Sequence, residues 1–277
     1  MTRIFLLAAG LGAMAPQAAM AVERVAVGAS FNRIYEQDAN GHWHGLGVDV
    51  LRLLAARAGD TVRFQLYPWP RAQAMVERGQ ADILVGPYRS PQRLKRFAYL
   101  EQPFYRDRLV FYARRASDVS WQGDYASLAG WRVLAVRGWH YGEPFDLARP
   151  KLDLSEVTQV DNGLQMLAHG RVDLLASNVR NSAVPIEALH LRDALVEMCP
   201  DIGRLDGYLA FPRDARFTAV RQRYDALFSQ MVRSGELQKL GHKNGVLVPG
   251  ADGDGRAATT LAAADCRPVS APARVQK

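Results

Sequence analysis

Beyond its first 21 residues, the sequence lacks any apolar run near the roughly 20 residues that a membrane-spanning helix needs. It also lacks a Gly-x-Ser-x-Gly elbow, a His-Glu-x-x-His pair and a Walker phosphate loop. Its basic residues are mostly arginines spread along the chain, not one block, although the formal net charge is +7. We therefore expect a soluble protein without these hydrolase or nucleotide-binding motifs, and we do not expect nucleic acid as a partner. Scattered arginines suit small carboxylates better, because the guanidinium fork matches the carboxylate geometry.

The N-terminus has the pattern of an export signal. Arg3 precedes an apolar run over residues 4–14, and a small-x-small cleavage site ends at Ala21. This pattern is too short for a membrane span, and a buried N-terminal helix is the alternative. No cysteine follows the apolar run, which argues against a lipid-anchored precursor. We predict a signal peptide over residues 1–21, cleaved near Ala21, and a periplasmic product.

Cysteine is scarce, since only Cys199 and Cys266 are present. An oxidising compartment favours a disulfide between them, and only one pairing is possible. Two unpaired thiols are the alternative. Residues 249–277 contain no aromatic residue and are rich in Ala, Gly and Pro, which predicts a mobile C-terminal tail that Cys266 would tether.

Short apolar strands alternate with amphipathic helices along the rest of the chain. This alternation predicts an α/β protein with open sheets. We expect strands at residues 24–29, 61–66, 81–85, 108–113, 131–136, 172–177 and 208–211. We expect helices at residues 48–58, 70–78, 162–168 and 215–234.

Two stretches of the chain match without a gap. Residues 79–91 read GQADILVGPYRSP and residues 170–182 read GRVDLLASNVRNS. Each contains a glycine, then an aspartate, then an apolar strand and a loop with an arginine, Arg89 or Arg180. The match fits one unit used in each of two α/β lobes, although chance similarity between two α/β units also explains it. We interpret Asp82 and Asp173 as structural anchors of these units.

The loop after residues 81–85 has the features of an anion site. Ser90 and a following proline form a helix start, whose free N–H groups would face the ligand edge of the sheet. Tyr88, Arg89 and Arg93 cluster there with Ser90. Solvated surface arginines are the alternative interpretation.

Six segments form an ordered set of motifs along the chain. They are GHWHGLGVDVLRLLAARAG (41–59), YPWPRAQAMVERGQADILVG (67–86), GPYRSPQR (86–93), LEQPFY (100–105), ASLAGWRVLAVRG (126–138) and SGELQKLGHK (234–243). In this order, over about 220 residues, they resemble the family 3 periplasmic solute-binding proteins, the polar amino acid receptors of ABC importers.

The resemblance implies a fold and a set of roles. It implies the type II periplasmic-binding-protein fold, with lobe 1 formed by residues 22–110 plus 207–248, lobe 2 by residues 111–206, and two hinge strands crossing near residues 108–113 and 207–211. It also implies that Arg93 grips a carboxylate with help from Ser90 and the backbone near Tyr88, in a protein without catalytic residues or cofactor. A monomer that delivers its ligand to a membrane permease is expected.

The sequence departs from the family pattern at the expected amine end of the ligand. Asn178 stands where the family usually has an aspartate, and Gly138-Trp139-His140 stands where it usually has Gly-Thr-Thr. An amide supplies no counter-charge to an ammonium. The expected ligand is an amino acid or derivative, and a carboxylate without an amine stays open. Further candidates are positive charge from Arg71, Arg89, Arg137 and Arg180, and apolar walls from Trp69, Tyr35, Tyr88 and Trp139.

Other functions remain as alternatives. An enzyme on the same scaffold, dehydratase-like on a cyclic carboxylate, would need an acid or base, for which Glu101, His140 and Glu143 are candidates. A ligand-sensing partner of a membrane receptor is a third possibility. His42 and His44 form a His-x-His pair without evident further ligands, so we expect an exposed turn and no metal site.

Overall fold

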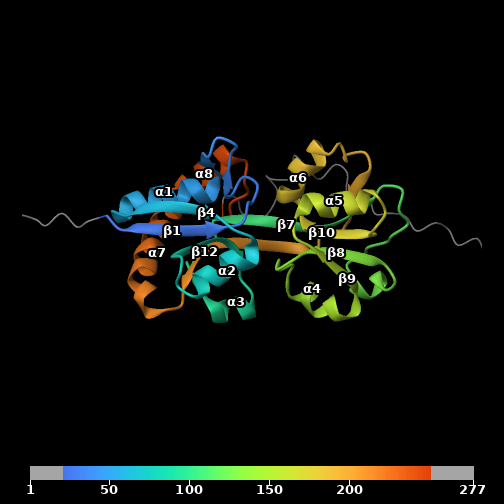
Figure 1. Cartoon of the computed structure of the whole chain (residues 1–277), viewed down its shortest axis with the longest axis horizontal. Coiled ribbons are helices and arrows are strands. Elements are labelled where there is room, and N and C mark those ends of the chain that lie inside the picture. The colour runs from blue at the N-terminus through green and yellow to red at the C-terminus, as the bar shows by residue number, and fades with distance from the viewer. Residues whose placement is uncertain (1–20, 251–277) are drawn as a thin grey trace, which may run out of the picture.

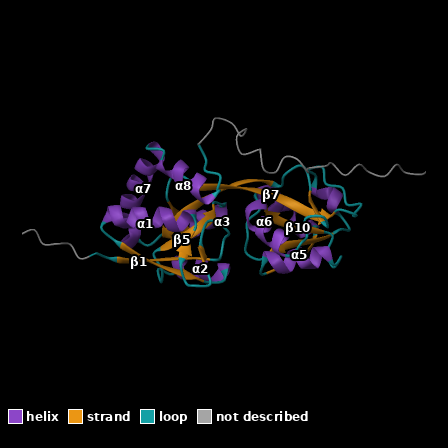
Figure 2. Cartoon of the chain, turned by 90° about the horizontal axis from the view of Figure 1, so that it is seen from above, coloured by secondary structure: helices purple, strands orange, loops and turns teal. Residues whose placement is uncertain are grey.

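One continuous sheet of ten strands runs through two lobes that lie side by side (Figure 1). The computed structural model describes residues 21–250. Along the main path, the strand order is β4-β1-β5-β12-β7-β10-β8-β9, with β6 added at β12 and β11 at β7. Strands β7 (Tyr105–Arg114) and β12 (Gly203–Pro212) connect the lobes (Figure 2). The predicted two-lobe α/β fold is confirmed, whereas the exact lobe boundaries stay a prediction.

Lobe 1 combines the N-terminal elements with the last helices of the described chain. Its strands are β1 (Glu23–Gly28), β4 (Thr61–Leu66), β5 (Ile83–Tyr88) and β6 (Phe97–Tyr99), and β2 (Glu36–Gln37) and β3 (Trp43–His44) form a hairpin beside them. Its helices are α1 (Leu46–Ala58), α2 (Trp69–Glu77), α3 (Pro91–Arg96), α7 (Thr218–Arg233) and α8 (Glu236–Asn244), with a 3-10 turn η3 (Ala215–Phe217).

Lobe 2 is smaller. Its strands are β8 (Arg132–Val136), β9 (Asp153–Val157), β10 (Leu174–Asn178) and β11 (Leu195–Glu197). Its helices are α4 (Glu143–Ala148), α5 (Val160–Ala168) and α6 (Val179–Ala188), with 3-10 turns η1 (Tyr125–Leu128) and η2 (Arg149–Lys151). Apolar clusters cover both faces of its sheet, one around Phe111 and Phe145 and the other around Leu164 and Leu167.

Helix α1 shows how the sequence pattern produces these elements. Val48, Leu51 and Leu54 recur at helical spacing and are fully buried. The helix ends at Gly59, which adopts the left-handed conformation with φ of 72° and caps the last turn. The observed helix therefore begins two residues before the predicted range 48–58 and ends at the same residue.

The strands cross between the lobes at a different place from the one predicted. β7 pairs with β12 over Tyr105–Leu109 and Gly203–Gly207, and this is the crossing section. The predicted sections 108–113 and 207–211 lie mostly inside the sheets of lobe 2 and lobe 1, respectively. The prediction followed apolar runs, which mark buried sheet, whereas the crossing section carries Arg106, Asp107 and Asp206.

The matching aspartates of the two repeated stretches have equivalent positions. Asp82 Oδ2 accepts a hydrogen bond from the Val25 backbone N–H at 2.8 Å, and Asp173 Oδ2 accepts one from the Arg132 backbone N–H at 3.0 Å. In each lobe, the aspartate before one strand thus fixes the start of its neighbour. The predicted anchoring role is confirmed.

The repeat does not extend through the following loop. Asn178 caps α6, whereas Ser90 caps α3, so the second helix begins three residues earlier relative to the ungapped match. As a result, Arg89 precedes its helix and Arg180 lies in the first turn of its helix. The two aligned arginines therefore occupy different environments.

Two predicted features lie wholly or partly outside the described residues. They are the signal peptide, and the C-terminal tail with Cys266, so the disulfide to Cys199 stays a prediction. Within residues 21–250, no helix is long and apolar enough to cross a membrane.

Asp173→Asn should destabilise the protein in a pH-dependent way. Hydrogen bonds from Arg132 lower the pKa of Asp173 from 3.8 to about 2. The carboxylate therefore contributes stability above pH 4, and this contribution is lost as the pH falls towards 2. At neutral pH, we expect the variant to lose about 2 kcal/mol of unfolding free energy, measured by urea denaturation.

The difference between the wild type and Asp173→Asn should shrink as the pH falls from about 5 to about 2.5. Asp193→Asn, at an exposed position, is the control and should change little. A difference that is constant over this pH range would contradict the assigned role of Asp173.

Candidate functional site

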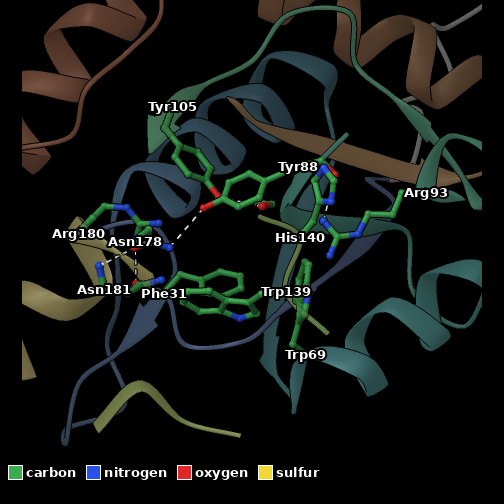
Figure 3. A pocket seen from close by; sticks show the side chains of 11 residues that line it. Phe31, Trp69, Tyr88, Arg93, Tyr105, Trp139, His140, Asn178, Arg180 and Asn181 are labelled. Carbon is green, nitrogen blue, oxygen red and sulfur yellow. Dashed lines mark hydrogen bonds between the residues drawn. The ribbon is translucent and has the colours of Figure 1, made fainter. Parts of the chain in front are cut away.

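A small cavity of about 20 Å³ lies between the two lobes (Figure 3). Lobe 1 contributes β5, α3 and the start of α2, and lobe 2 contributes the end of β10, the first turn of α6 and the loop after β8. The cavity has room for about one water molecule, so the lobes are closed over it. Its lining consists of Phe31, Trp69, Gly86, Tyr88, Arg93, Tyr105, Trp139, His140, Asn178, Arg180 and Asn181.

Arg93 is the central basic residue of the lobe 1 side. Its backbone N–H donates to Ser90 Oγ, which places it in the first turn of α3, and only 7% of the residue is exposed. Nη1 donates to the Tyr88 carbonyl at 3.1 Å, and Nη2 reaches across the cleft to the Gly138 carbonyl at 2.9 Å. Among residues 21–250, no carboxylate pairs with it. Burial lowers the pKa of Arg93 from its usual value.

Arg180, the basic residue of the lobe 2 side, is neutralised. Its Nε and Nη2 donate to both carboxylate oxygens of Asp107, at 2.9 and 2.7 Å. Burial lowers the pKa of Arg180, but the charge and hydrogen bonds of Asp107 outweigh this effect and place the pKa above its usual value. The Tyr88 hydroxyl also donates to Asp107 Oδ2, at 2.5 Å. Because its charge is balanced, Arg180 adds less positive potential to the cavity than Arg93.

Three asparagines hold the lobes together. The Asn32 backbone N–H donates to Asn181 Oδ1 at 2.9 Å, and Asn32 Nδ2 donates to the Asn181 carbonyl at 3.2 Å. Asn178 Oδ1 accepts from the Asn181 backbone N–H at 2.8 Å, and Asn178 Nδ2 donates to the Tyr88 hydroxyl at 3.3 Å. Asn178 therefore acts both as the cap of α6 and as a cross-lobe donor.

Aromatic rings form the apolar wall. Phe31 packs edge-to-face on Trp69 with ring centroids 5.1 Å apart, and on Trp139 at 6.3 Å (Figure 3). Trp139 comes from lobe 2 and the other two rings come from lobe 1. Their contact closes the apolar side of the cleft.

His140 is the ionisable residue beside Arg93 in Figure 3. Its Nδ1 lies 2.5 Å from Asp146 Oδ2, and the residue is 8% exposed. Burial raises the pKa of Asp146, but hydrogen bonds from His140 and Arg149 outweigh this and lower it. The pair orients the imidazole in the cavity wall.

The structure brings several of the predicted site residues together at the cavity. Tyr88, Trp69, Arg93, Trp139 and Asn178 line it directly. Ser90 and Gly138 do not line it, but each hydrogen-bonds to Arg93.

Other predicted site residues do not line the cavity. Arg89 donates to the carbonyls of Leu100 and Glu101 and stacks over Tyr208, with 4.0 Å between its Cζ and the ring centroid. Arg71 is exposed beside Tyr67. Tyr35 is fully buried in lobe 1, where its hydroxyl donates to the Ala26 carbonyl at 2.8 Å.

Three more candidates are also absent from the cavity lining. Arg137 pairs with Glu156 at 3.3 Å. Glu101 and Glu143, which were considered as catalytic groups, are both exposed.

Sequence reasoning missed Asp107, Asn32 and Asn181. Asp107 lies between Arg106 and Arg108 in β7, just before an apolar run, and this charged triplet in a strand is the signal that could have revealed it. Asn181 aligns with Ser90 in the repeated stretches, which could have indicated a position near a helix start, and it lies in the first turn of α6. Nothing in the sequence near Asn32 indicates its partner 149 residues away.

Comparison of the sequence with models of protein families identifies the family of this chain. The model of the bacterial extracellular solute-binding proteins, family 3, matches residues 24–245. The chain belongs to this family. The resemblance inferred from the sequence is therefore confirmed. No curated protein sequence matches the chain significantly.

Solved structures with the same fold include family 3 relatives and a receptor domain. A histidine kinase sensor domain with similarity to periplasmic binding proteins has a TM-score of 0.73 and 21% identity, and the match covers 83% of this chain and 99% of that one. An ABC uptake transporter substrate-binding protein from Streptococcus pneumoniae with bound histidine has a TM-score of 0.67 and 16% identity, and the match covers 80% of this chain and 91% of that one. The ancestral amino acid-binding protein AncCDT-1, a precursor of cyclohexadienyl dehydratase, has a TM-score of 0.65 and 17% identity, and the match covers 81% of this chain and 94% of that one.

Asp107→Asn should destabilise the protein strongly, because it leaves the Arg180 guanidinium buried without its counter-charge. The side chains of Arg180 and Asp107 are only 10% and 2% exposed. We expect a loss of about 3–5 kcal/mol of unfolding free energy, measured by urea denaturation.

The neighbouring pair Arg106–Asp206, which joins β7 to β12, provides a matched control. It is also bidentate, at 2.6 and 3.0 Å, but its side chains are 41% and 24% exposed. Asp206→Asn should therefore cost about 0–1 kcal/mol. Equal losses in the two variants would show that burial does not set the strength of the Asp107 pair.

Proposed function

We propose that this protein is a periplasmic receptor that captures a small carboxylate in the cleft between its lobes and delivers it to an ABC importer. Small carboxylates in this sense include amino acids and their derivatives. The family and its fold support a solute-binding role. The observation that supports this proposal most directly is the buried guanidinium of Arg93 in the cavity wall. Within the described chain, this guanidinium has no carboxylate partner.

A buried cation without a counter-charge is costly for a protein to maintain. Neutral carbonyl groups hold Arg93 in place but leave its charge uncompensated. A carboxylate bound to the planar fork would supply both the charge and two aligned acceptors. Binding of an anion at this position therefore has a large favourable electrostatic contribution that the ligand-free cleft lacks.

Opening and closing of the lobes provides the route into the cavity. The closed cleft has too little room for a ligand, so the ligand must enter when the lobes separate about β7 and β12. The Arg93–Gly138 and Asn32–Asn181 hydrogen bonds cross between the lobes. On closure, these contacts and the bound ligand together would hold the lobes, and a closed receptor would be recognised by its permease.

Transport and sensing use the same binding step. Relatives described as transporter substrate-binding proteins support delivery to an importer, whereas the sensor-domain relative supports a signalling partner. We favour transport because several of the similar structures are named as ABC transporter substrate-binding proteins.

One observation favours enzymatic activity as a second candidate. His140 lines the cavity, and Asp146 orients its ring as in an acid–base pair. A dehydratase-like reaction on a cyclic carboxylate would place such a group beside an acid-binding arginine. Product formation from a bound cyclic acid, abolished in His140→Gln, would establish this candidate.

Arg93→Lys should weaken carboxylate binding by about 10- to 100-fold, because lysine keeps the charge but loses the bidentate fork. A thermal-shift screen with propionate, benzoate, pyruvate and common amino acids would identify a ligand, and calorimetry would give its affinity. Arg96→Lys, on the same helix but paired with Glu77 at the surface, is the matched control.

The Arg96→Lys variant should bind like the wild type. Unchanged affinity in Arg93→Lys would refute Arg93 as the carboxylate-binding residue. The absence of binding by every carboxylate in the screen would refute the proposed ligand class.

A further inference from the structure

We propose that the physiological ligand is a carboxylate that carries no ammonium group and has a flat apolar body. This inference rests on the proposed function and narrows its ligand class. It follows from a comparison of the hydrogen-bond donors and acceptors around the cavity, together with the balance of charge and the nature of the walls.

The cavity offers donors to an anion. A guanidinium has five N–H donors, of which the structure uses two at Arg93, both on main-chain carbonyls. One of these carbonyls, that of Gly138, belongs to the opposite lobe. Separation of the lobes would free Nη2 of Arg93, and a carboxylate oxygen could then occupy the position that the Gly138 oxygen takes in the closed cleft.

The amide and carboxylate oxygens around the cavity, by contrast, each already accept at least one internal hydrogen bond. Asn178 Oδ1 accepts from the Asn181 backbone, and Asn181 Oδ1 accepts from Asn32 and from Arg180 Nη1 at 3.0 Å. Both oxygens of Asp107 accept from Arg180, and one also accepts from Tyr88.

An ammonium group needs acceptors for three N–H donors. In this cleft, the ammonium would find only neutral oxygens, because the nearest carboxylate, Asp107, is already paired with Arg180. Asn178 cannot compensate by turning its amide, because the oxygen would then leave the cap of α6 and the NH₂ group would face the Asn181 N–H. The absence of a free carboxylate among the described lining residues therefore disfavours an amine.

The charge balance leads to the same ligand class. Arg93 and Arg180 line the cavity, and Asp107 balances only Arg180. Within residues 21–250, no aspartate or glutamate lines the cavity. One positive charge thus remains, which a monoanion neutralises, whereas an amino acid zwitterion brings a second cation close to Arg93 and Arg180.

The walls indicate the shape of the rest of the ligand. Phe31 packs edge-to-face on both Trp69 and Trp139, and the Arg93 Cζ lies 5.8 Å from the centroid of the Trp69 ring, so the aromatic wall adjoins the guanidinium. When the lobes open, Trp139 moves away from Phe31 and Trp69, because it belongs to the other lobe. A planar ring or short apolar chain can then fill the space between these rings, and burial of that apolar surface favours closure over it.

Matched ligand pairs test this inference in the full-length mature protein by isothermal titration calorimetry. Phenylpropionate and phenyllactate are compared with L-phenylalanine, and propionate is compared with L-alanine. Within each comparison, the carboxylate and carbon skeleton are shared, and the amine is either absent or, in phenyllactate, replaced by a hydroxyl. We expect the amine-free acids to bind at least about tenfold more tightly, which corresponds to about 1.4 kcal/mol.

Asn178→Asp provides a second measurement at the same site. Aspartate caps a helix as well as asparagine does, so α6 should be retained, and melting of the variant checks this. The added carboxylate should shift the preference towards the amino acid of each pair by about tenfold or more relative to the wild type. Asp118→Asn, which changes an exposed loop residue, is the control and should leave the preference unchanged.

The outcomes separate this inference from the proposed function. Tighter binding of the amino acid in every pair would overturn the inference and leave the carboxylate receptor intact. No binding by any member of the pairs, with no effect of Arg93→Lys in the wider screen, would overturn both. An Asn178→Asp variant that folds but keeps the wild-type preference would remove Asn178 from the selection against amines.

Discussion

The guanidinium of Arg93 lies buried between two lobes and is held by the main-chain carbonyls of Tyr88 and Gly138. A main-chain carbonyl orients a cation but does not neutralise it, so within the described chain the charge of Arg93 stays unbalanced. The position of α3 depends on the Ser90 cap, and the cap places Arg93 at the cleft. The proposed preference for an anion follows from this one buried charge, and the Arg93–Gly138 hydrogen bond is one of the contacts that join the lobes.

The second buried arginine shows what a balanced charge does in the same cleft. Arg180 is paired with Asp107 on β7, one of the two strands that cross between the lobes. This pair, with Tyr88 and Asn178, connects lobe 2 to the hinge through fixed hydrogen bonds. The structure thus separates two arginines that the sequence does not distinguish, since Arg180 is paired with Asp107 and Arg93 has no carboxylate partner within the described chain.

The sequence predicts the fold well because its signals are local. The helical stripe of α1, the Ser90 cap and the aspartate anchors each depend on residues close together in the chain, or on a pattern repeated in both lobes. The family resemblance also identified Arg93 and the departure at Asn178 from short motifs. These positions needed no knowledge of long-range contacts.

The site was less predictable, because its partners come from distant parts of the chain. Arg89 and Arg180 align in the repeated stretches, but a three-residue difference in the helix start separates their environments. Tyr35 belongs to an aromatic segment that looked like a ligand wall, yet its hydroxyl fits a lobe 1 hydrogen-bond network and its ring is buried there. Asp107 and Asn181 matter only through contacts that folding creates.

The most direct measurement is a crystal structure of the protein with the tightest-binding carboxylate. The account predicts that both carboxylate oxygens lie on the Arg93 guanidinium, that the Gly138 carbonyl no longer accepts from Nη2, and that the Arg180–Asp107 pair stays intact. A carboxylate bound to Arg180 in place of Asp107, or bound outside the cavity while Arg93 keeps its contact with Gly138, would contradict it.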